Sequence, residues 1–175
     1  DGTYKAGHYN SIGDVRSQSL SLLSSQFDRI GINTKAFNGR LLDIGCGNGR
    51  VWSLFPNATI DGIDAIVTPD KRFLRDGITY GKTNFDGYIS DNRYDLILMI
   101  GSLYLMENKV NVINKCVCML NSGGKIVVLE NTNRFYSNGD GGRYFNLQEL
   151  CNKTNTKVVN YVLIDNIEMK LIVPS

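Results

Sequence analysis

The 175-residue chain is 42% hydrophobic and 21% charged and carries a formal net charge of +2, values that are ordinary for a globular protein of one domain. No apolar stretch reaches the roughly 18 residues of a membrane span, so we expect no membrane segment. The 19 Lys and Arg are dispersed among 17 Asp and Glu and form no basic stripe of the kind that binds nucleic acids.

The cysteines and the N-terminus bear on the cellular compartment. The four cysteines lack the spacing of a zinc site, so we expect free thiols and no metal; they are Cys46, Cys116, Cys118 and Cys151. No signal-peptide pattern opens the chain, which together with free thiols predicts a reducing, cytoplasmic location. The first residue is Asp rather than Met, which suggests that the chain was excised or released from a longer polypeptide.

Helices and strands are expected to alternate along the chain. Residues 1–13 have the composition of a loop or arm, and a helix is predicted from Asp14, its N-cap, to Gly31. Apolar runs, glycines and prolines mark the remaining elements. Strands are predicted at 41–44, 58–64, 78–83, 94–100, 125–129, 157–164 and 168–173, and helices at 51–55, 69–77, 106–120 and 147–151.

Two of these strands indicate the shape of the sheet. Residues 94–100 are nearly continuously apolar, which is typical of a strand buried on both faces at the centre of a parallel sheet. The last two strands are joined by Asp165 and Asn166, a turn-forming pair that suits a hairpin. We therefore predict an α/β fold with a mostly parallel, doubly wound sheet whose last strand is antiparallel.

Three glycines at alternate positions follow the first strand. Gly45, Gly47 and Gly49 would let a ligand lie directly on the main chain. The sixth position of a dinucleotide fingerprint is Arg50 here, and the lysine of a triphosphate-binding loop is missing. The segment thus favours a ligand with adenosine and no phosphate, although a tight strand-to-helix connection is the simpler alternative.

A carboxylate ends the second strand, about twenty residues beyond the glycines. Ligands of doubly wound sheets bind beyond the carboxyl ends of the strands, where such an acid accepts ribose hydroxyl protons. Asp64 stands at this place and would accept both protons. The alternative role for Asp64 is to cap a turn or helix at the strand end.

With Asp43 before the first glycine, residues 41–49 resemble the first signature motif of class I S-adenosylmethionine-dependent methyltransferases. The resemblance extends from about Tyr4 to Val173. It implies a Rossmann-like doubly wound seven-stranded sheet and a single domain over residues 1–175, with an amino-terminal arm and helix at 1–33 and a core at 38–175.

The resemblance also implies a cofactor, S-adenosylmethionine, and residues that would bind it. Asp43 would hold the amino group of the cofactor, and Arg16 its carboxylate. Asn84 stands where the family often has an acid against the adenine amino group, with Asp86 as a rival. The full set of expected cofactor-binding residues is Arg16, Asp43, Gly45, Cys46, Gly47, Asn48, Gly49, Asp64, Ala65, Asn84, Phe85, Ile100, Gly101 and Ser102.

Expected substrate contacts come from three segments. Tyr9 would belong to an amino-terminal lid, and Tyr104 would face the transferred methyl group, unless its ring packs on the core instead. The loop at 131–146 interleaves arginines with aromatic rings, a pattern that can stack a base but also occurs in solvated loops. The expected substrate residues are Tyr9, Tyr104, Glu130, Arg134, Tyr136, Arg143 and Tyr144.

The function expected from this resemblance is methyl transfer to a nucleophilic nitrogen or oxygen, largely by positioning. No convincing general base is found in the sequence, so no catalytic residue is predicted. The acceptor is left open between a small molecule, RNA and a protein. A small substrate would have to be enclosed by the amino-terminal arm and the 131–146 loop; otherwise the substrate is large, or a partner subunit completes the pocket. The alternatives are an RNA cap guanine-N7 methyltransferase domain cut from a viral polyprotein, a non-catalytic binding or activator subunit of this fold, and a nicotinamide enzyme.

Overall fold

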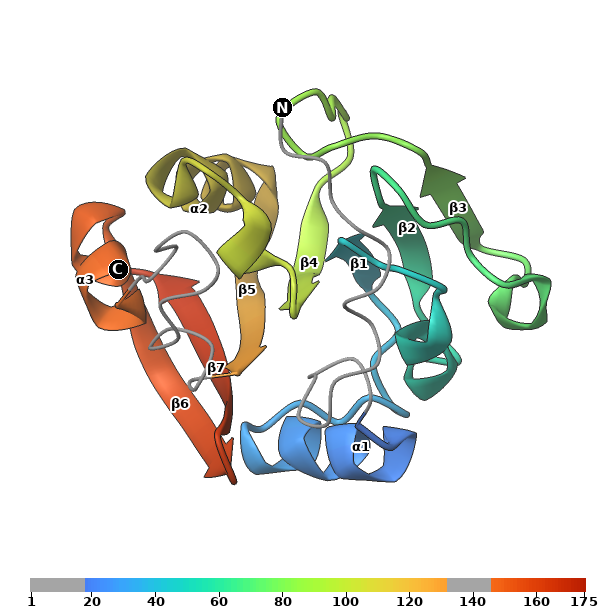
Figure 1. The fold of residues 1–175 in the computed structure, drawn as a ribbon, viewed down its shortest axis with the longest axis horizontal. Coiled ribbons are helices and arrows are strands. Elements are labelled where there is room, and N and C mark those ends of the chain that lie inside the picture. Colours follow the sequence, from blue (N-terminus) through green and yellow to red (C-terminus); the bar gives the residue numbers. More distant parts are fainter. Residues whose placement is uncertain (1–17, 132–145) are drawn as a thin grey trace.

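The computed structural model describes residues 18–131 and 146–175. One seven-stranded sheet lies at its centre, with the strand order β3-β2-β1-β4-β5-β7-β6 (Figure 1). The strands are β1 (Arg40–Ile44), β2 (Thr59–Ile63), β3 (Ile78–Gly81), β4 (Tyr94–Ile100), β5 (Leu120–Asn131), β6 (Thr156–Ile164) and β7 (Ile167–Pro174). Strands β1 to β5 pair in parallel, and β7 is antiparallel to both β5 and β6. The predicted Rossmann-like, mostly parallel sheet with an antiparallel last strand is confirmed.

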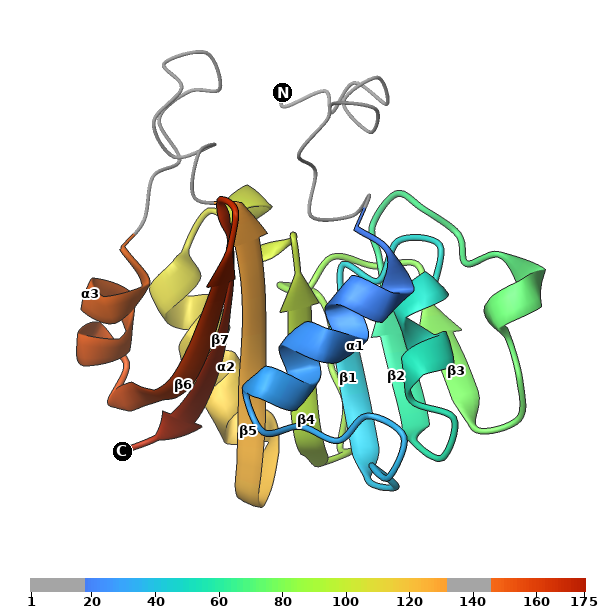
Figure 2. The same ribbon diagram turned by 90° about the horizontal axis from the view of Figure 1, so that it is seen from below.

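Helices cover both faces of the sheet. The α-helices are α1 (Leu20–Arg29), α2 (Lys109–Met119) and α3 (Leu147–Lys153), and the 3₁₀ helices are η3 (Arg50–Leu54), η4 (Lys71–Phe73) and η5 (Leu103–Leu105). One apolar core joins α1 and η3 to one face of the sheet, and a second core joins α2 and α3 to the other face (Figure 2). None of the helices in the described ranges is long and apolar enough to cross a membrane.

Two helix starts differ from the sequence prediction because nearby side chains cap later positions. Helix α1 begins at Leu20, where the Ser19 hydroxyl accepts the Leu22 N–H; the expected cap, Asp14, lies outside the described residues. Helix α2 begins at Lys109 rather than at 106, since Asn108 accepts the Asn111 N–H. It ends at Met119, and β5 starts at once.

The short helix expected after β1 is present as a 3₁₀ helix, whereas the helix expected after β2 is much shorter than predicted. Residues 50–54 form a 3₁₀ helix, and the helix expected at 69–77 is only the single turn η4. Hydrogen bonds of the main chain and of side chains hold residues 69–77 in a largely non-helical conformation. The Asp70 N–H donates to the Asn48 carbonyl, and the Arg75 guanidinium donates to the carbonyls of Phe55 and Ala58. No α-helix therefore joins β1 to β2, β2 to β3 or β3 to β4.

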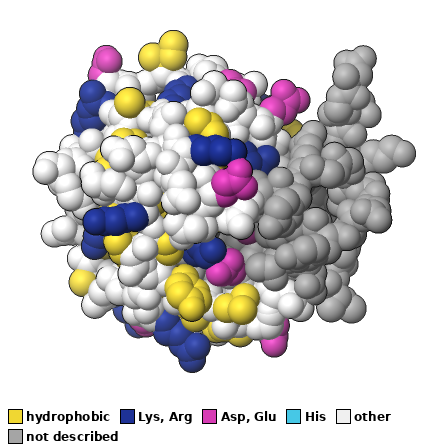
Figure 3. Space-filling view, turned by 90° about the vertical axis from the view of Figure 1, so that its left-hand side faces the viewer, with side chains coloured by type: hydrophobic (Ala, Val, Ile, Leu, Met, Phe, Trp, Pro, Cys, Tyr) yellow, Lys and Arg dark blue, Asp and Glu magenta, His cyan; other side chains and the backbone are white. Residues whose placement is uncertain are grey.

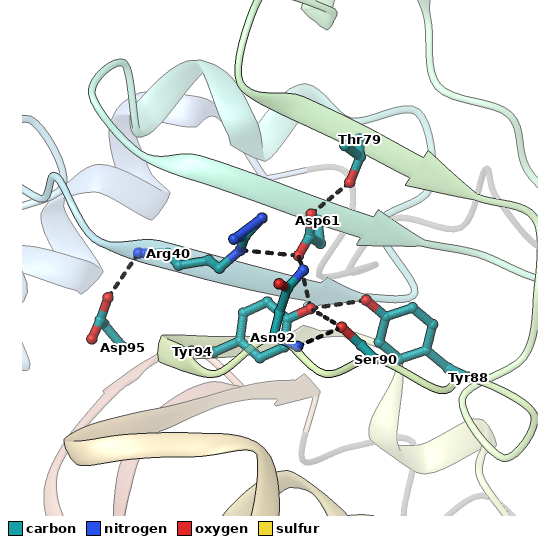
Figure 4. Close-up of polar contacts among 8 residues, drawn as sticks. All are labelled: Arg40, Asp61, Thr79, Tyr88, Ser90, Asn92, Tyr94 and Asp95. Carbon is teal, nitrogen blue, oxygen red and sulfur yellow. Dashed lines mark hydrogen bonds and ion pairs between the residues drawn. The ribbon is translucent and has the colours of Figure 1, made fainter.

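A buried carboxylate ties the middle of the sheet together (Figure 4). Asp61 on β2 accepts hydrogen bonds from Thr79 (2.5 Å), Tyr94 (2.8 Å) and Asn92 (3.1 Å) and lies 3.3 Å from Arg40 Nε. Burial by itself raises the pKa of Asp61, but the hydrogen bonds from Thr79 and Tyr94 and the charge of Arg40 outweigh it and hold the pKa below its ordinary value. The charged form of Asp61 thus stabilises the fold.

The single tryptophan fills the space between β2 and the turn after β1. A Cβ at Gly49 would come within 2.7 Å of the Trp52 ring, and a Cβ at Gly62 would overlap the same ring. Trp52 is 1% exposed, and its indole N–H donates to Asp43 at 2.8 Å. The absence of side chains at both glycines therefore lets one ring pack under the turn.

We expect Asp61→Asn to lower the free energy of unfolding by about 2–4 kcal/mol at pH 7, because donors are left without a charged acceptor. A carboxyl with a depressed folded-state pKa contributes stability above its unfolded pKa and loses it as the pH falls through the folded value. The difference between the two proteins should therefore shrink below about pH 4. Urea unfolding from pH 3 to 7 measures this difference, with Asp91→Asn, at an exposed position next to Asn92, as the control. An Asp61→Asn effect independent of pH would contradict the assignment.

We expect Gly62→Ala to destabilise the protein by about 1–3 kcal/mol through overpacking against Trp52, and to change the emission of this single tryptophan. Gly31→Ala is the control, since Gly31 has φ +87° but no atom of residues 18–131 or 146–175 within 4 Å of its added Cβ. This control should lose some stability through backbone strain and keep the native emission spectrum. Equal emission spectra for both variants would show that the ring does not occupy this space.

Candidate functional site

The candidate site lies at the edge of the sheet where the parallel strands end. The chain winds from β1 outward to β3 and then crosses to β4 on the other side of β1, so β1 and β4 form the switch point at which ligands of this architecture bind. The glycine turn follows β1, Asp64 follows β2, Gly101 and Ser102 follow β4, and Glu130 lies near the end of β5. The strand order therefore brings most of the predicted site residues to one edge.

All three predicted glycines have left-handed backbone angles. The φ values are +74° at Gly45, +57° at Gly47 and +81° at Gly49, a region that residues with a Cβ rarely adopt. The reasons for glycine differ between them. A Cβ at Gly45 would come within 2.5 Å of Ser102 Cβ, whereas a Cβ at Gly47 would meet no atom of the described residues within 4 Å. The main chain at Gly47 thus borders space that no described residue fills.

Most N–H groups of the turn donate to acceptors within the protein. Gly45 and Cys46 both donate to the Ile63 carbonyl, at 2.8 and 3.0 Å, and Gly47 donates to Asp64 at 2.9 Å. Gly49 donates to the Cys46 carbonyl, and the Arg50 N–H donates to the Asn48 side chain. A phosphate site aims such N–H groups at the ligand. This turn instead presents main chain that a neutral group can lie against.

Asp64 performs the capping role that the sequence left open. One carboxylate oxygen accepts the N–H of Gly47, and the other accepts those of Ile66 (2.9 Å) and Val67 (2.8 Å). The residue is 8% exposed. A carboxylate has about four acceptor positions, so these three bonds leave room for one more donor. Ala65 beside it is exposed, while Cys46 is buried.

Asp43 lies beneath the turn. It is 2% exposed and accepts the Trp52 indole N–H. Sequence reasoning treated Trp52 only as an apolar helix position, although an indole three residues after the last glycine could have been recognised as a partner for the acid. Asp43 is therefore fixed in orientation by a side chain of η3.

The segment after β4 closes the other side of the site. The Ser102 hydroxyl donates to the Ile44 carbonyl at 2.6 Å, and the Gly101 N–H donates to the Leu129 carbonyl at 2.7 Å. The Tyr104 N–H donates to Glu130 at 3.2 Å. Glu130 is 6% exposed, so its carboxylate is held close to the turn that contains Ser102. Ile100, at the end of β4, is also buried.

The segment after β3 is arranged around a lysine of α2. Lys115 donates to the carbonyls of Phe85 (2.6 Å) and Asp86 (3.2 Å), and its ammonium lies 4.6 Å from the centre of the Phe85 ring. Phe85 is only 5% exposed and belongs to the core. Asn84 and Asp86 are both exposed, and the Asn84 side chain accepts the Gly87 N–H. Both rivals for the adenine contact therefore remain at the surface.

The remaining predicted residues lie outside the part of the chain that the structure describes. They are Tyr9, Arg16, Arg134, Tyr136, Arg143 and Tyr144. Sequence reasoning also missed two polar residues in the described part. Asp61 interrupts an otherwise apolar strand, which is a signal that a sequence can reveal, whereas the burial of Gln18 has no such signal.

Comparison with known proteins identifies the family. A family model described as a methyltransferase domain matches residues 16–165. A curated malonyl-[acyl-carrier protein] O-methyltransferase of Ilyobacter polytropus is 28% identical over 105 residues, which are 55% of this chain and 39% of that protein. The match thus spans about two fifths of that relative's length.

Solved structures share the fold. A Burkholderia thailandensis 1,6-didemethyltoxoflavin-N1-methyltransferase with bound 1,6-didemethyltoxoflavin and S-adenosylhomocysteine is 15% identical, with a TM-score of 0.64 over 91% of this chain and 77% of its own. An O-methyltransferase from neocarzinostatin biosynthesis, in complex with S-adenosylmethionine and 2-hydroxy-5-methyl naphthoic acid, is 18% identical, with a TM-score of 0.64. That match covers 89% of this chain and 55% of the other chain. The chain therefore belongs to the methyltransferase domain family, as its resemblance to class I S-adenosylmethionine-dependent methyltransferases predicted.

Proposed function

We propose that this methyltransferase moves the methyl group of S-adenosylmethionine to a nucleophilic nitrogen or oxygen of a small molecule. The choice of S-adenosylmethionine as the cofactor rests on the turn at residues 45–50. Its N–H groups are bonded within the protein at every position except Asn48, among the described residues, yet no described residue fills the space that a Cβ of Gly47 would occupy. Such a turn suits the sugar and sulfonium of S-adenosylmethionine better than a pyrophosphate, whose negative charges would need free N–H donors. A nicotinamide cofactor is disfavoured for the same reason.

The cofactor would lie along the carboxyl edge from β3 to β4. Asp64 would accept a ribose hydroxyl with its remaining acceptor position, and Asn84 or Asp86 would meet the adenine at the exposed segment after β3. Gly45, Gly47 and the residues after β4 would contact the sugar and the methionine part. Asp43, held by Trp52, supplies a negative charge beneath the turn that favours the cationic amino group.

The bound cofactor supplies a sulfonium, which is already a good leaving group. The protein then has to hold an acceptor atom in line with the methyl group, about 3 to 3.5 Å away. The turn after β4 and the adjoining end of β5 lie next to the glycine turn through Ser102. Glu130 stands at this position as a buried carboxylate, and its negative charge favours an acceptor that is a hydroxyl or an amine, both of which can donate to it.

A small acceptor is favoured over RNA by the surface and by the relatives. On the face that carries α3 and β6, the described Lys and Arg side chains are interspersed with Asp and Glu (Figure 3), and RNA-binding surfaces usually concentrate positive charge. Two of the related structures contain small methyl acceptors. The RNA cap guanine-N7 and non-catalytic alternatives become outcomes of the activity test.

The activity test uses S-adenosylmethionine labelled in its methyl group. We expect label in a small amine or hydroxyl compound when the protein is incubated with a metabolite mixture, and none in capped RNA. Label in capped RNA alone would support the cap methyltransferase alternative. Saturable cofactor binding without turnover on any metabolite, RNA or protein would support the non-catalytic one.

The role of Asp64 is tested with the ribose hydroxyls themselves. We expect Asp64→Ala to weaken S-adenosylhomocysteine binding by about tenfold to a hundredfold, since a hydrogen bond to a charged group contributes about 1.5–3 kcal/mol. Because the substitution also removes three loop hydrogen bonds, calorimetry should be repeated with a 2′-deoxy and a 3′-deoxy analogue. The wild type should bind at least one deoxy analogue more weakly than S-adenosylhomocysteine. Asp64→Ala should bind both analogues as tightly as it binds S-adenosylhomocysteine. Equal discrimination by both proteins would remove Asp64 from the ribose site.

A further inference from the structure

A glutamine just before α1 is buried at the end of that helix that lies next to η3 (Figures 1 and 2). Gln18 directly precedes Ser19, the N-cap of α1. Both ribbon views show the N-terminal end of α1 next to η3, at the edge where the strands end (Figures 1 and 2). Because η3 begins at Arg50, immediately after the glycine turn, the end of α1 that Gln18 precedes lies next to the element that follows this turn.

The amide of Gln18 is left without a hydrogen-bond partner. The residue is 7% exposed, and neither its oxygen nor its nitrogen bonds to any of the described residues. A buried amide without a partner costs about 1–3 kcal/mol. Such groups are rare in folded proteins and call for an explanation such as a bound molecule.

A second glutamine offers a comparison within the same helix. Gln26 is 0% exposed, and its amide also has no partner among the described residues. It lies with Leu23 and Phe27 among the buried residues of α1, well inside the helix rather than at its N-terminal end. Burial without a partner is therefore shared by both glutamines, and position at the helix end that lies next to η3 distinguishes Gln18 (Figures 1 and 2).

We propose that Gln18 binds the amino-acid end of the cofactor, with its amide N–H donating to the carboxylate and its amide oxygen free to accept from the ammonium group. An amide is suited to this end because it both donates and accepts, and because a hydrogen bond to an ionised group is stronger than a neutral one. Asp43, held beneath the turn by Trp52, then supplies the opposite charge for the ammonium. This inference rests on the proposed cofactor.

The test compares two ligands that differ only at the amino-acid end. S-adenosylhomocysteine carries the carboxylate and ammonium, and 5′-methylthioadenosine lacks both. We expect Gln18→Met to weaken the binding of S-adenosylhomocysteine about tenfold, as measured by calorimetry. The affinity for 5′-methylthioadenosine should remain unchanged. Gln18→Glu should weaken the binding of S-adenosylhomocysteine further, because the glutamate carboxylate would face the carboxylate of the ligand. Gln26→Met should change the affinity for neither ligand.

The outcomes separate this inference from the proposed cofactor. If the wild type binds neither ligand, the cofactor proposal itself fails. If it binds both and Gln18→Met leaves both affinities unchanged, or lowers both equally, Gln18 does not bind the amino-acid end. Thermal unfolding without ligand identifies folded variants, and should Gln18→Met not fold, the same ligand comparison with Gln18→Glu decides. The inference would also be overturned if Gln26→Met lowered the affinity for S-adenosylhomocysteine as much as Gln18→Met does.

Discussion

The turn after β1 depends on two side chains that occupy the space where glycine lacks a Cβ. Ser102 fills the place above Gly45, and Trp52 fills the place beside Gly49. Each of these side chains also makes a hydrogen bond that links elements: Ser102 to the Ile44 carbonyl and Trp52 to Asp43. The left-handed angles of the turn are thus stabilised by close packing as well as permitted by glycine. The shape of the turn, and with it the candidate site, follows from this packing.

Polar side chains compensate for the short helices on the β2 and β3 side of the sheet. Where a crossover helix could have buried apolar surface, the 82–93 segment reaches the strands through Asn92, which donates to Asp61. Lys115 fixes the same segment from α2 through two carbonyls. Hydrogen bonds to a buried charge require particular partners, whereas apolar contacts tolerate many. This side of the molecule is therefore held by a few specific residues, and it is also where the adenine contact is proposed.

The sequence was most informative where a signal depends on periodicity or on glycine. The apolar run 94–100 matches β4 at both ends, and the pair Asp165 and Asn166 forms the predicted hairpin turn between β6 and β7. Helix lengths were predicted poorly, because long-range contacts decide them: Arg75 binds carbonyls about twenty positions earlier in the chain, which no local pattern reveals. The partners of Asp64 were likewise inaccessible, since capping and ligand binding need the same carboxylate.

Those two roles of Asp64 limit each other. With three loop N–H groups bonded to its carboxylate, one acceptor position remains, so a single ribose hydroxyl can be accepted unless a loop bond breaks. The sequence-based expectation of two accepted hydroxyls therefore requires one of the three loop N–H groups to be released, for example that of Gly47. Release at Gly47 would free a donor at the point where the main chain borders space that no described residue fills. Binding of the second hydroxyl and opening of the glycine turn would then be one coupled event, whose free energy is the difference between two hydrogen bonds to the same carboxylate.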